Sequence, residues 1–157
     1  FNTNSYYKTK RKLNMITKVF HKKKLYAMII KNKYRNKKGI TFFSPDNLPQ
    51  QFGYINHVKN HIILPHQHKR RRTKVLYTTE IIIMLKGMLR VDFYNSKNKY
   101  LLSKRVKKGE LIFLMHGGHG FKVLKNAQMI EVKQGPFLKI KDKVKFKNID
   151  EKMIKFK

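Results

Sequence analysis

Residues 54–134 alternate apolar or β-branched runs with turn-forming residues at intervals of about ten positions. The clearest runs are TEIIIML at 79–85, MLRVDFY at 88–94, YLLSKRV at 100–106 and LIFLM at 111–115. Strands of this length, separated by turns at this spacing, predict an all-β sandwich or barrel. Because TEIIIML and LIFLM are apolar on both strand faces, we expect both faces to be covered, as in a double-sheet jelly roll.

Further strand signals lie on either side of these four runs. Enrichment in β-branched and aromatic residues, bounded by turn residues, predicts strands at 16–20, 25–31, 40–44, 54–58, 61–66, 121–124 and 127–134. The first two of these flank HKKK and are expected to form a β-hairpin. The C-terminal residues are expected to be either a final strand or a frayed tail.

The chain of 157 residues is long enough for one domain with terminal extensions. Residues 1–38 carry thirteen Lys and Arg and no acidic residue, so we assign them to a basic N-terminal segment that includes the hairpin. Residues 39–147 are expected to form the β domain, and residues 148–157 a C-terminal tail. Because the chain begins with Phe1 and Met15 offers an alternative start, we interpret it either as a fragment or as a reading frame over-extended by residues 1–14.

The formal net charge is +30 at pH 7, which favours contact with nucleic acid or with anionic surfaces. Lys outnumbers Arg by 31 to 7, whereas dedicated nucleic-acid binders favour Arg for its planar, bidentate contacts. The sequence has no recognition-helix, ribonucleoprotein or zinc-finger motif. We therefore interpret the charge as mainly compositional, and keep a nucleic-acid or anionic-surface binder as an alternative function.

Two absences in the sequence narrow the classes of protein. The chain has no cysteine, which excludes disulfides, thiolate zinc sites and a cysteine nucleophile. No apolar run reaches the roughly 18 residues that a membrane-spanning helix needs, and the basic N-terminus lacks a signal-peptide core. We expect a cytoplasmic protein without membrane insertion.

Two histidines and a glutamate are positioned to face the interior of the predicted fold. His66 and His68 are two residues apart, so on a strand their side chains project from the same face. Glu80 is in phase with Ile82 and Met84 and is therefore expected to point inward as well. A buried carboxylate without a partner is costly, and a metal ion or a hydrogen-bonded ion pair would remove that cost.

A third histidine, His119, follows the glycine-rich turn in HGGHG and can approach from an opposing strand. Three histidines and one carboxylate suit a divalent ion of Fe, Mn, Zn, Ni or Cu, and affinity alone does not select among them. The sequence therefore predicts one divalent metal ion, with His66, His68, Glu80 and His119 as candidate ligands.

The stretch 66–119 resembles the two motifs of the cupin superfamily. The HxH pair at 66–68 is similar to the start of the first motif, and Glu80 with Gly87 is similar to its second half. Eleven residues separate His68 from Glu80, where the family has a much shorter spacing. The basic run between them is therefore interpreted as an inserted surface loop.

The second cupin motif is similar to Gly109, ELIFLM and the closing HGGHG, with His119 in the ligand position. Met115 stands where the family has a proline, and the spacing to His119 is short by a single residue. His116 therefore competes for the ligand position. The other role expected of His116 is to hydrogen-bond to a metal ligand and so hold that ligand in orientation.

This resemblance implies a double-stranded β-helix, the cupin jelly-roll barrel, over residues 39–147. It also implies that one divalent metal ion is bound through the four candidate ligands, and that the protein forms a homodimer. The chain also resembles, more narrowly, small single-domain cupins found among genes for surface-polysaccharide and nucleotide-sugar biosynthesis. This narrower resemblance is based on the segments VLYTTEIIIMLKGMLRVDFYNS, HGGHGFKVL and IEVKQGPF.

The narrower resemblance implies a small polar ligand, namely a sugar or a sugar nucleotide. An enzyme of this kind would be an isomerase or epimerase in which the metal acts as a Lewis acid and Glu131 or His116 moves a proton. A non-enzymatic sugar-binding or sensor module is the alternative.

Glu131 and Lys133 share one strand face, which lines the barrel or carries a surface ion pair. Arg90 and Asp92 are expected to form a solvent-facing pair.

Overall fold

The computed structural model describes residues 15–136 and 142–157, so the expected over-extended start at 1–14 lies outside the described residues. The chain divides into two compact units, one made of residues 78–157 together with the N-terminal residues up to 34, and one made of residues 35–77. Whether residues 39–147 fold as an independent domain stays a prediction. In the part of the chain that the structure describes, no helix is long and apolar enough to cross a membrane.

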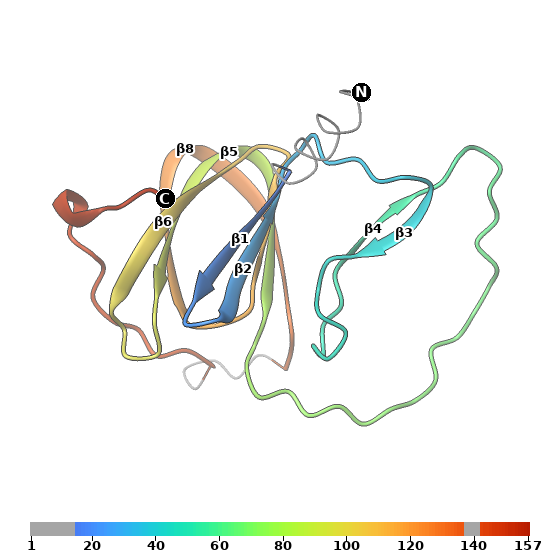
Figure 1. Cartoon of the computed structure of the whole chain (residues 1–157), viewed down its shortest axis with the longest axis horizontal. Helices are drawn as coiled ribbons and strands as arrows, with labels where there is room; N and C mark the ends of the chain where they lie inside the picture. The colour runs from blue at the N-terminus through green and yellow to red at the C-terminus, as the bar shows by residue number, and fades with distance from the viewer. Residues whose placement is uncertain (1–14, 137–141) are drawn as a thin grey trace, which may run out of the picture. The chain divides into compact units, whose positions relative to one another are not determined.

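The first unit is a curled antiparallel sheet, and Figure 1 shows β5 and β8 running side by side through the curl. Its strands follow the order β1-β2-β7-β5-β6, and β8 pairs with β5. β5 pairs with β7 through its first residues and with β6 through its last. The expectation of an all-β fold is confirmed, as a half-barrel. The strands are β1 (Ile16–His21), β2 (Lys24–Ile30), β5 (Glu80–Tyr94), β6 (Tyr100–Lys107), β7 (Leu111–Leu114) and β8 (Gly118–Lys133).

The N-terminal hairpin expected from the sequence is present as β1 and β2, which pair antiparallel. β2 then pairs with β7 along the register Ala27↔Leu114 to Ile30↔Leu111, so the hairpin extends the main sheet. Lys22 and Lys23 adopt positive φ values of 46° and 63° in the turn. Two consecutive left-handed residues match the twist that a tight hairpin requires.

The expectation of separate strands at 79–85 and 88–94 is wrong, because β5 continues through Gly87 as one strand. The pairing with β8 shifts register between Met84 and Leu89, as in a β-bulge, which bends a strand without ending its ladder. Gly87 has φ +80°, and a Cβ there would collide with the backbone of Asn126. The expectation of separate strands at 121–124 and 127–134 is wrong for the same reason, since β8 follows β5 across the bulge.

The bulge also changes which side chains face the core. Ile82 and Met84 point inward before it, whereas Leu89, Val91 and Phe93 point inward after it, so the inward positions change from even to odd numbers. Ile81 is buried as well, at 7% exposure, which confirms that this apolar run is covered on both faces. The core cluster consists of Val19, Tyr26, Ala27, Ile29, Ile82, Met84, Leu89, Val91, Phe93, Val106, Ile112 and Leu114.

Residues 148–157 form neither a regular strand nor a frayed tail, and Phe156 makes an isolated parallel bridge with Ser103 of β6. The C-terminal tail contains a single 3-10 turn, η2 (Glu151–Met153), and lies against β5 and β6. The backbone N–H of Ile149 donates to the Tyr94 hydroxyl at 3.1 Å, and the backbone N–H of Ser103 donates to the Lys155 carbonyl at 2.8 Å. These contacts hold the tail on the outer face of the sheet.

The tail explains why Arg90 and Asp92 are not solvent-facing, as the sequence analysis expected. The two residues are only 5% and 4% exposed. Arg90 Nε donates to Asp92 Oδ1 at 2.8 Å, and Arg90 Nη1 donates to Glu151 Oε2 at 2.7 Å. The Ser103 hydroxyl also donates to Asp92. Arg90 and Asp92 do project from the same face of β5, as expected, but the C-terminal tail covers that face.

The second unit contains one small hairpin, formed by β3 (Gly39–Phe42) and β4 (Gly53–Asn56). Between these strands, Gln51 closes the loop by donating from Nε2 to the carbonyl of Leu48 at 2.9 Å and by accepting from the Ser44 hydroxyl at 3.0 Å. The strand expected at 61–66 is absent, since residues 57–79 contain no strand. Pro65 lacks the N–H that a ladder needs, which is consistent with this irregular course.

Candidate metal centre

Glu80 and His119 come together on the inner side of the curled sheet. Glu80 opens β5, lies in phase with the core residues Ile82 and Met84, and is only 7% exposed. His119 pairs in register with Phe93, at the far end of β5, and therefore shares the inward face with that fully buried ring. Curling of the sheet brings the two ends of β5 together, and His119 Nε2 lies 2.9 Å from Glu80 Oε2.

The surroundings of Glu80 keep its carboxylate ionised. The hydrogen bond from His119 lowers the pKa of Glu80 below its ordinary value of 4.5, although partial burial acts in the opposite direction. The positive charges of Lys143 and Lys133 lower this pKa further. An ionised carboxylate directed at an imidazole nitrogen provides two donor atoms of the types that divalent transition metals prefer.

The distance between these two donor atoms fits a shared ion as well as a direct hydrogen bond. Two ligand atoms at right angles, each about 2.1 Å from one metal ion, are separated by about 3.0 Å. The separation of Glu80 Oε2 and His119 Nε2 is 2.9 Å. The pair is therefore spaced as two neighbouring ligands would be, although an ion would have to replace the proton that His119 Nε2 donates to Glu80.

His66 and His68 lie in the second unit, on its irregular segment, and both are exposed. Their rings meet edge to face with centroids 5.4 Å apart. His66 Nδ1 is 2.9 Å from the carbonyl oxygen of Leu64. The expectation that they project from a strand is wrong, because this segment forms no strand. Within residues 15–136 and 142–157, no three or more His, Asp or Glu side chains are grouped closely enough to hold a metal ion, and ligation by the full set of four stays a prediction.

His116, the competing histidine, follows β7 and contacts the N-terminal hairpin. Its Nδ1 lies 3.0 Å from the Leu25 carbonyl oxygen, and its ring lies 6.5 Å from that of Tyr26. Because a carbonyl only accepts, the proton of this hydrogen bond belongs to Nδ1, which leaves Nε2 as the acceptor nitrogen of a neutral ring.

Glu131 and Lys133 lie on the inward-facing side of β8. Glu131 pairs in register with Ile82, and Lys133 pairs with Glu80, so both side chains share the face that carries the candidate ligands. Lys133 Nζ is 2.5 Å from Asp142 Oδ2, and this contact raises the pKa of Lys133. The sequence analysis placed Lys133 on this face from the two-residue period of the strand, but it missed Asp142, the partner of Lys133.

The same face of β8 carries an exposed apolar strip between its polar ends. Phe121 and Val123 pair with the core residues Val91 and Leu89, yet they are 42% and 56% exposed. Met129, opposite Met84, is 36% exposed. This apolar strip therefore lies between His119 and Glu131 on one face of β8.

Comparison of the chain with protein-family models, with curated proteins and with solved structures finds no match.

Proposed function

We propose that this protein is a metal-binding cupin that binds, or acts on, a small polar metabolite of the sugar or sugar-nucleotide class. In this proposal His66, His68, Glu80 and His119 hold one divalent metal ion, and the curled sheet is part of a jelly-roll barrel. The observation that carries the proposal is the inward-facing pair of Glu80 and His119, with donor atoms 2.9 Å apart. A carboxylate at 7% exposure within an apolar sheet needs a partner of this kind.

The tautomer of His66 supports its assignment as a ligand. The Leu64 carbonyl near His66 Nδ1 requires a proton on that nitrogen, because a carbonyl can only accept. The lone pair of a neutral ring is then on Nε2, the nitrogen directed away from this contact. Metal-ligating histidines commonly donate their other ring N–H to a backbone carbonyl, which fixes the ring for binding.

The surrounding residues suggest how a metabolite is handled. A bound divalent ion would supply Lewis-acid polarisation of a carbonyl or hydroxyl oxygen. Glu131 lies on the inward face of β8 and is exposed, so its carboxylate is available to take or return a proton. Phe121, exposed on the same face, offers a flat apolar surface for the C–H face of a sugar ring. An enzyme with this site would catalyse isomerisation or epimerisation.

Metal analysis of histidine variants tests this proposal. Protein purified without a metal-binding tag is expected to carry close to one equivalent of a divalent metal, measured by mass spectrometry. The double variant His66→Ala, His68→Ala is expected to lose it, and Glu80→Gln to retain less than wild type, because each change removes ligands.

A matched control removes the same number of histidines from the same unit. His57 and His61 stack with ring centroids 3.8 Å apart and are not among the proposed ligands. The double variant His57→Ala, His61→Ala is therefore expected to keep its metal. Loss of metal from this control together with retention in the His66, His68 variant would contradict the assignment, and so would wild-type protein that takes up no metal after reconstitution.

A further inference from the structure

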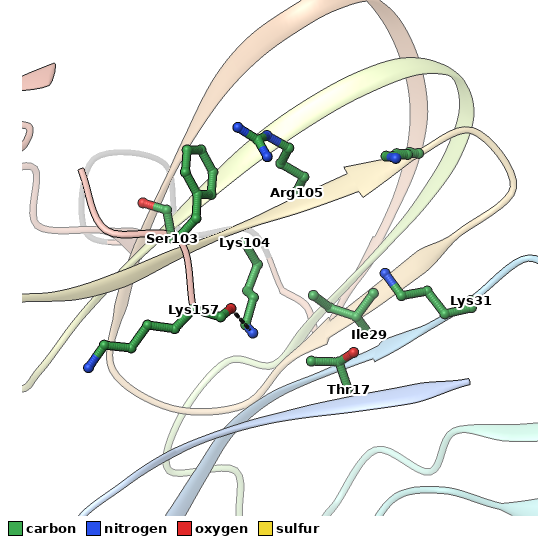
Figure 2. Close-up of a pocket in the computed structure, with 9 residues that line it drawn as sticks. Thr17, Ile29, Lys31, Ser103, Lys104, Arg105 and Lys157 are labelled. Atoms are coloured by element: carbon green, nitrogen blue, oxygen red, sulfur yellow. Dashed lines mark hydrogen bonds between the residues drawn. The ribbon is translucent and has the colours of Figure 1, made fainter. Parts of the chain in front are cut away.

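A cavity lies in the first unit between β6 and the β1–β2 hairpin. β1 and β6 are the last strands of the sheet order on its two sides. Thr17 and Ile29 line the cavity from the hairpin, and Ser103 and Lys104 line it from β6 (Figure 2). Its volume is about 310 Å³, at the lower end of the range for small-ligand sites.

The lining of this cavity is strongly positive. Five of its nine lining residues have a basic side chain and none has an acidic one: Lys31, Lys104, Arg105, Lys107 and Lys157. Lys and Arg make up 38 of the 157 residues, so about two would line a nine-residue cavity by composition alone. The lining is therefore richer in Lys and Arg than the chain is on average.

Lys104 is the lysine of this cavity whose charged form is disfavoured by its surroundings. Burial lowers its pKa, and the positive charge of Lys31 lowers it further. Its ammonium donates to a main-chain oxygen of Lys157 (Figure 2). Lys31 has a carboxylate partner, Glu110, at 3.2 Å. A bound anion would favour the charged form of Lys104, which burial and the charge of Lys31 disfavour.

Arg105 is held in place for recognition of a planar or tetrahedral anion. Its guanidinium lies 3.8 Å above the ring centroid of Phe156, a cation–π contact that occupies one face of the group. Stacking of this kind leaves the N–H groups at the edge of the guanidinium for hydrogen bonds. Phe156 is itself positioned because the neighbouring Lys155 is bonded to Ser103 and Tyr100.

We propose that this cavity binds the phosphate group of a small phosphorylated metabolite. A multivalent anion matches several cations gathered around a small volume, and Arg with Lys is the usual pair of residue types for phosphate. The cavity is lined by none of the proposed metal ligands, so this inference is separate from the proposed metal centre and does not depend on it.

Binding of inorganic pyrophosphate, followed by isothermal titration calorimetry, tests this proposal. The protein is first stripped of metal with a chelator and then desalted, so that neither a bound metal nor the chelator contributes. Wild type at physiological salt is expected to bind one equivalent. The variant Lys104→Gln, Lys107→Gln is expected to bind at least about tenfold more weakly, because two charge-assisted contacts are removed.

The matched control is Lys97→Gln, Lys99→Gln, which removes the same charge from exposed positions in the turn between β5 and β6. It is expected to bind within about twofold of wild type, since screening weakens distant surface charges. If the two double variants lose the same affinity for pyrophosphate, the attraction is diffuse and the proposal is overturned. The same holds if wild type prefers an RNA oligonucleotide to pyrophosphate and both double variants lose the same affinity for that RNA. Absence of saturable binding in wild type would overturn it too.

Circular dichroism establishes that the variants are folded. Lys107→Gln alone, at an exposed side chain, serves as the decisive variant if the double change unfolds the protein. Removal of this one lysine is expected to weaken pyrophosphate binding by about threefold or more. No weakening by Lys107→Gln in folded protein would then contradict the proposal.

Discussion

Replacement of Glu80 by Gln tests the pairing on which the candidate metal centre is based. Glu80 Oε2 accepts a hydrogen bond from His119 Nε2 over 2.9 Å. A hydrogen bond to an ionised group contributes about 1.5–3 kcal/mol, compared with about 0.5–1.5 kcal/mol for a neutral one. Gln keeps the shape and a neutral acceptor. Since the His119 side chain is 26% exposed, solvent screening reduces the expected loss of unfolding free energy to about 1 kcal/mol.

Thermal unfolding of metal-stripped protein, followed by circular dichroism, measures this loss. A change of about 1 kcal/mol lowers the Tm of a unit of this size by about 3–6 °C. The pKa of Glu80 is lowered in the folded state, so the carboxylate stabilises the fold above about pH 4.5, and its contribution disappears as the pH falls through the lowered pKa. The difference in Tm between wild type and Glu80→Gln is therefore expected to shrink below pH 4.5.

A double-mutant cycle with His119→Gln separates the pair from the individual residues. If the two side chains interact as the structure shows, the combined variant is expected to lose at least about 0.5 kcal/mol less than the sum of the single variants. Additive losses within about 0.3 kcal/mol would refute the reasoning, since residues without contact are additive at that level.

Two further predictions concern the bend in β5 and the docking of the C-terminal tail. Gly87→Ala is expected to lower the free energy of unfolding by more than about 1 kcal/mol in a urea titration, because the residue has φ +80° and its Cβ would collide with the backbone of Asn126. Gly39→Ala, also at positive φ but with no atom within 4 Å of the added Cβ, is the control for backbone strain alone. Equal losses of unfolding free energy in the two variants would contradict the account. Arg90 and Lys122 lower the pKa of Glu151 to about 2, so the contact that this carboxylate makes is expected to be present above about pH 4.5 and lost only as the pH falls through about 2. Hydrogen exchange of the tail from pH 5 to pH 2.5 measures this, and a tail released already at pH 4 in wild type would contradict it.

The all-β class of this chain could be predicted from its sequence because the apolar and β-branched runs are dense where strands pair on both sides. Glu80 was expected to point inward from its phase with Ile82 and Met84, and both of these residues belong to the core cluster. Its partner was harder to predict. The contact with His119 depends on the curl of β5, which no local pattern encodes, and the ligand role of both residues stays a prediction.

The errors of the sequence analysis have identifiable causes. Gly87 was interpreted as a break between strands, whereas it bends one strand, because the sequence does not show that β8 follows on the other side. Arg90 and Asp92 were placed on the correct face, but the C-terminal tail covers that face and the sequence gives little indication of where a tail docks. At 61–66 an apolar run without a partner strand forms no ladder, which shows that β propensity is insufficient without pairing.

Anomalous diffraction from crystals grown with Mn²⁺ tests the central claim most directly. The proposed metal centre predicts one strong anomalous peak about 2.0–2.3 Å from a Glu80 carboxylate oxygen and from His119 Nε2, with His66 and His68 completing the ligand set. An anomalous map without a peak at Glu80, in which Glu80 and His119 stay directly hydrogen-bonded, would contradict it.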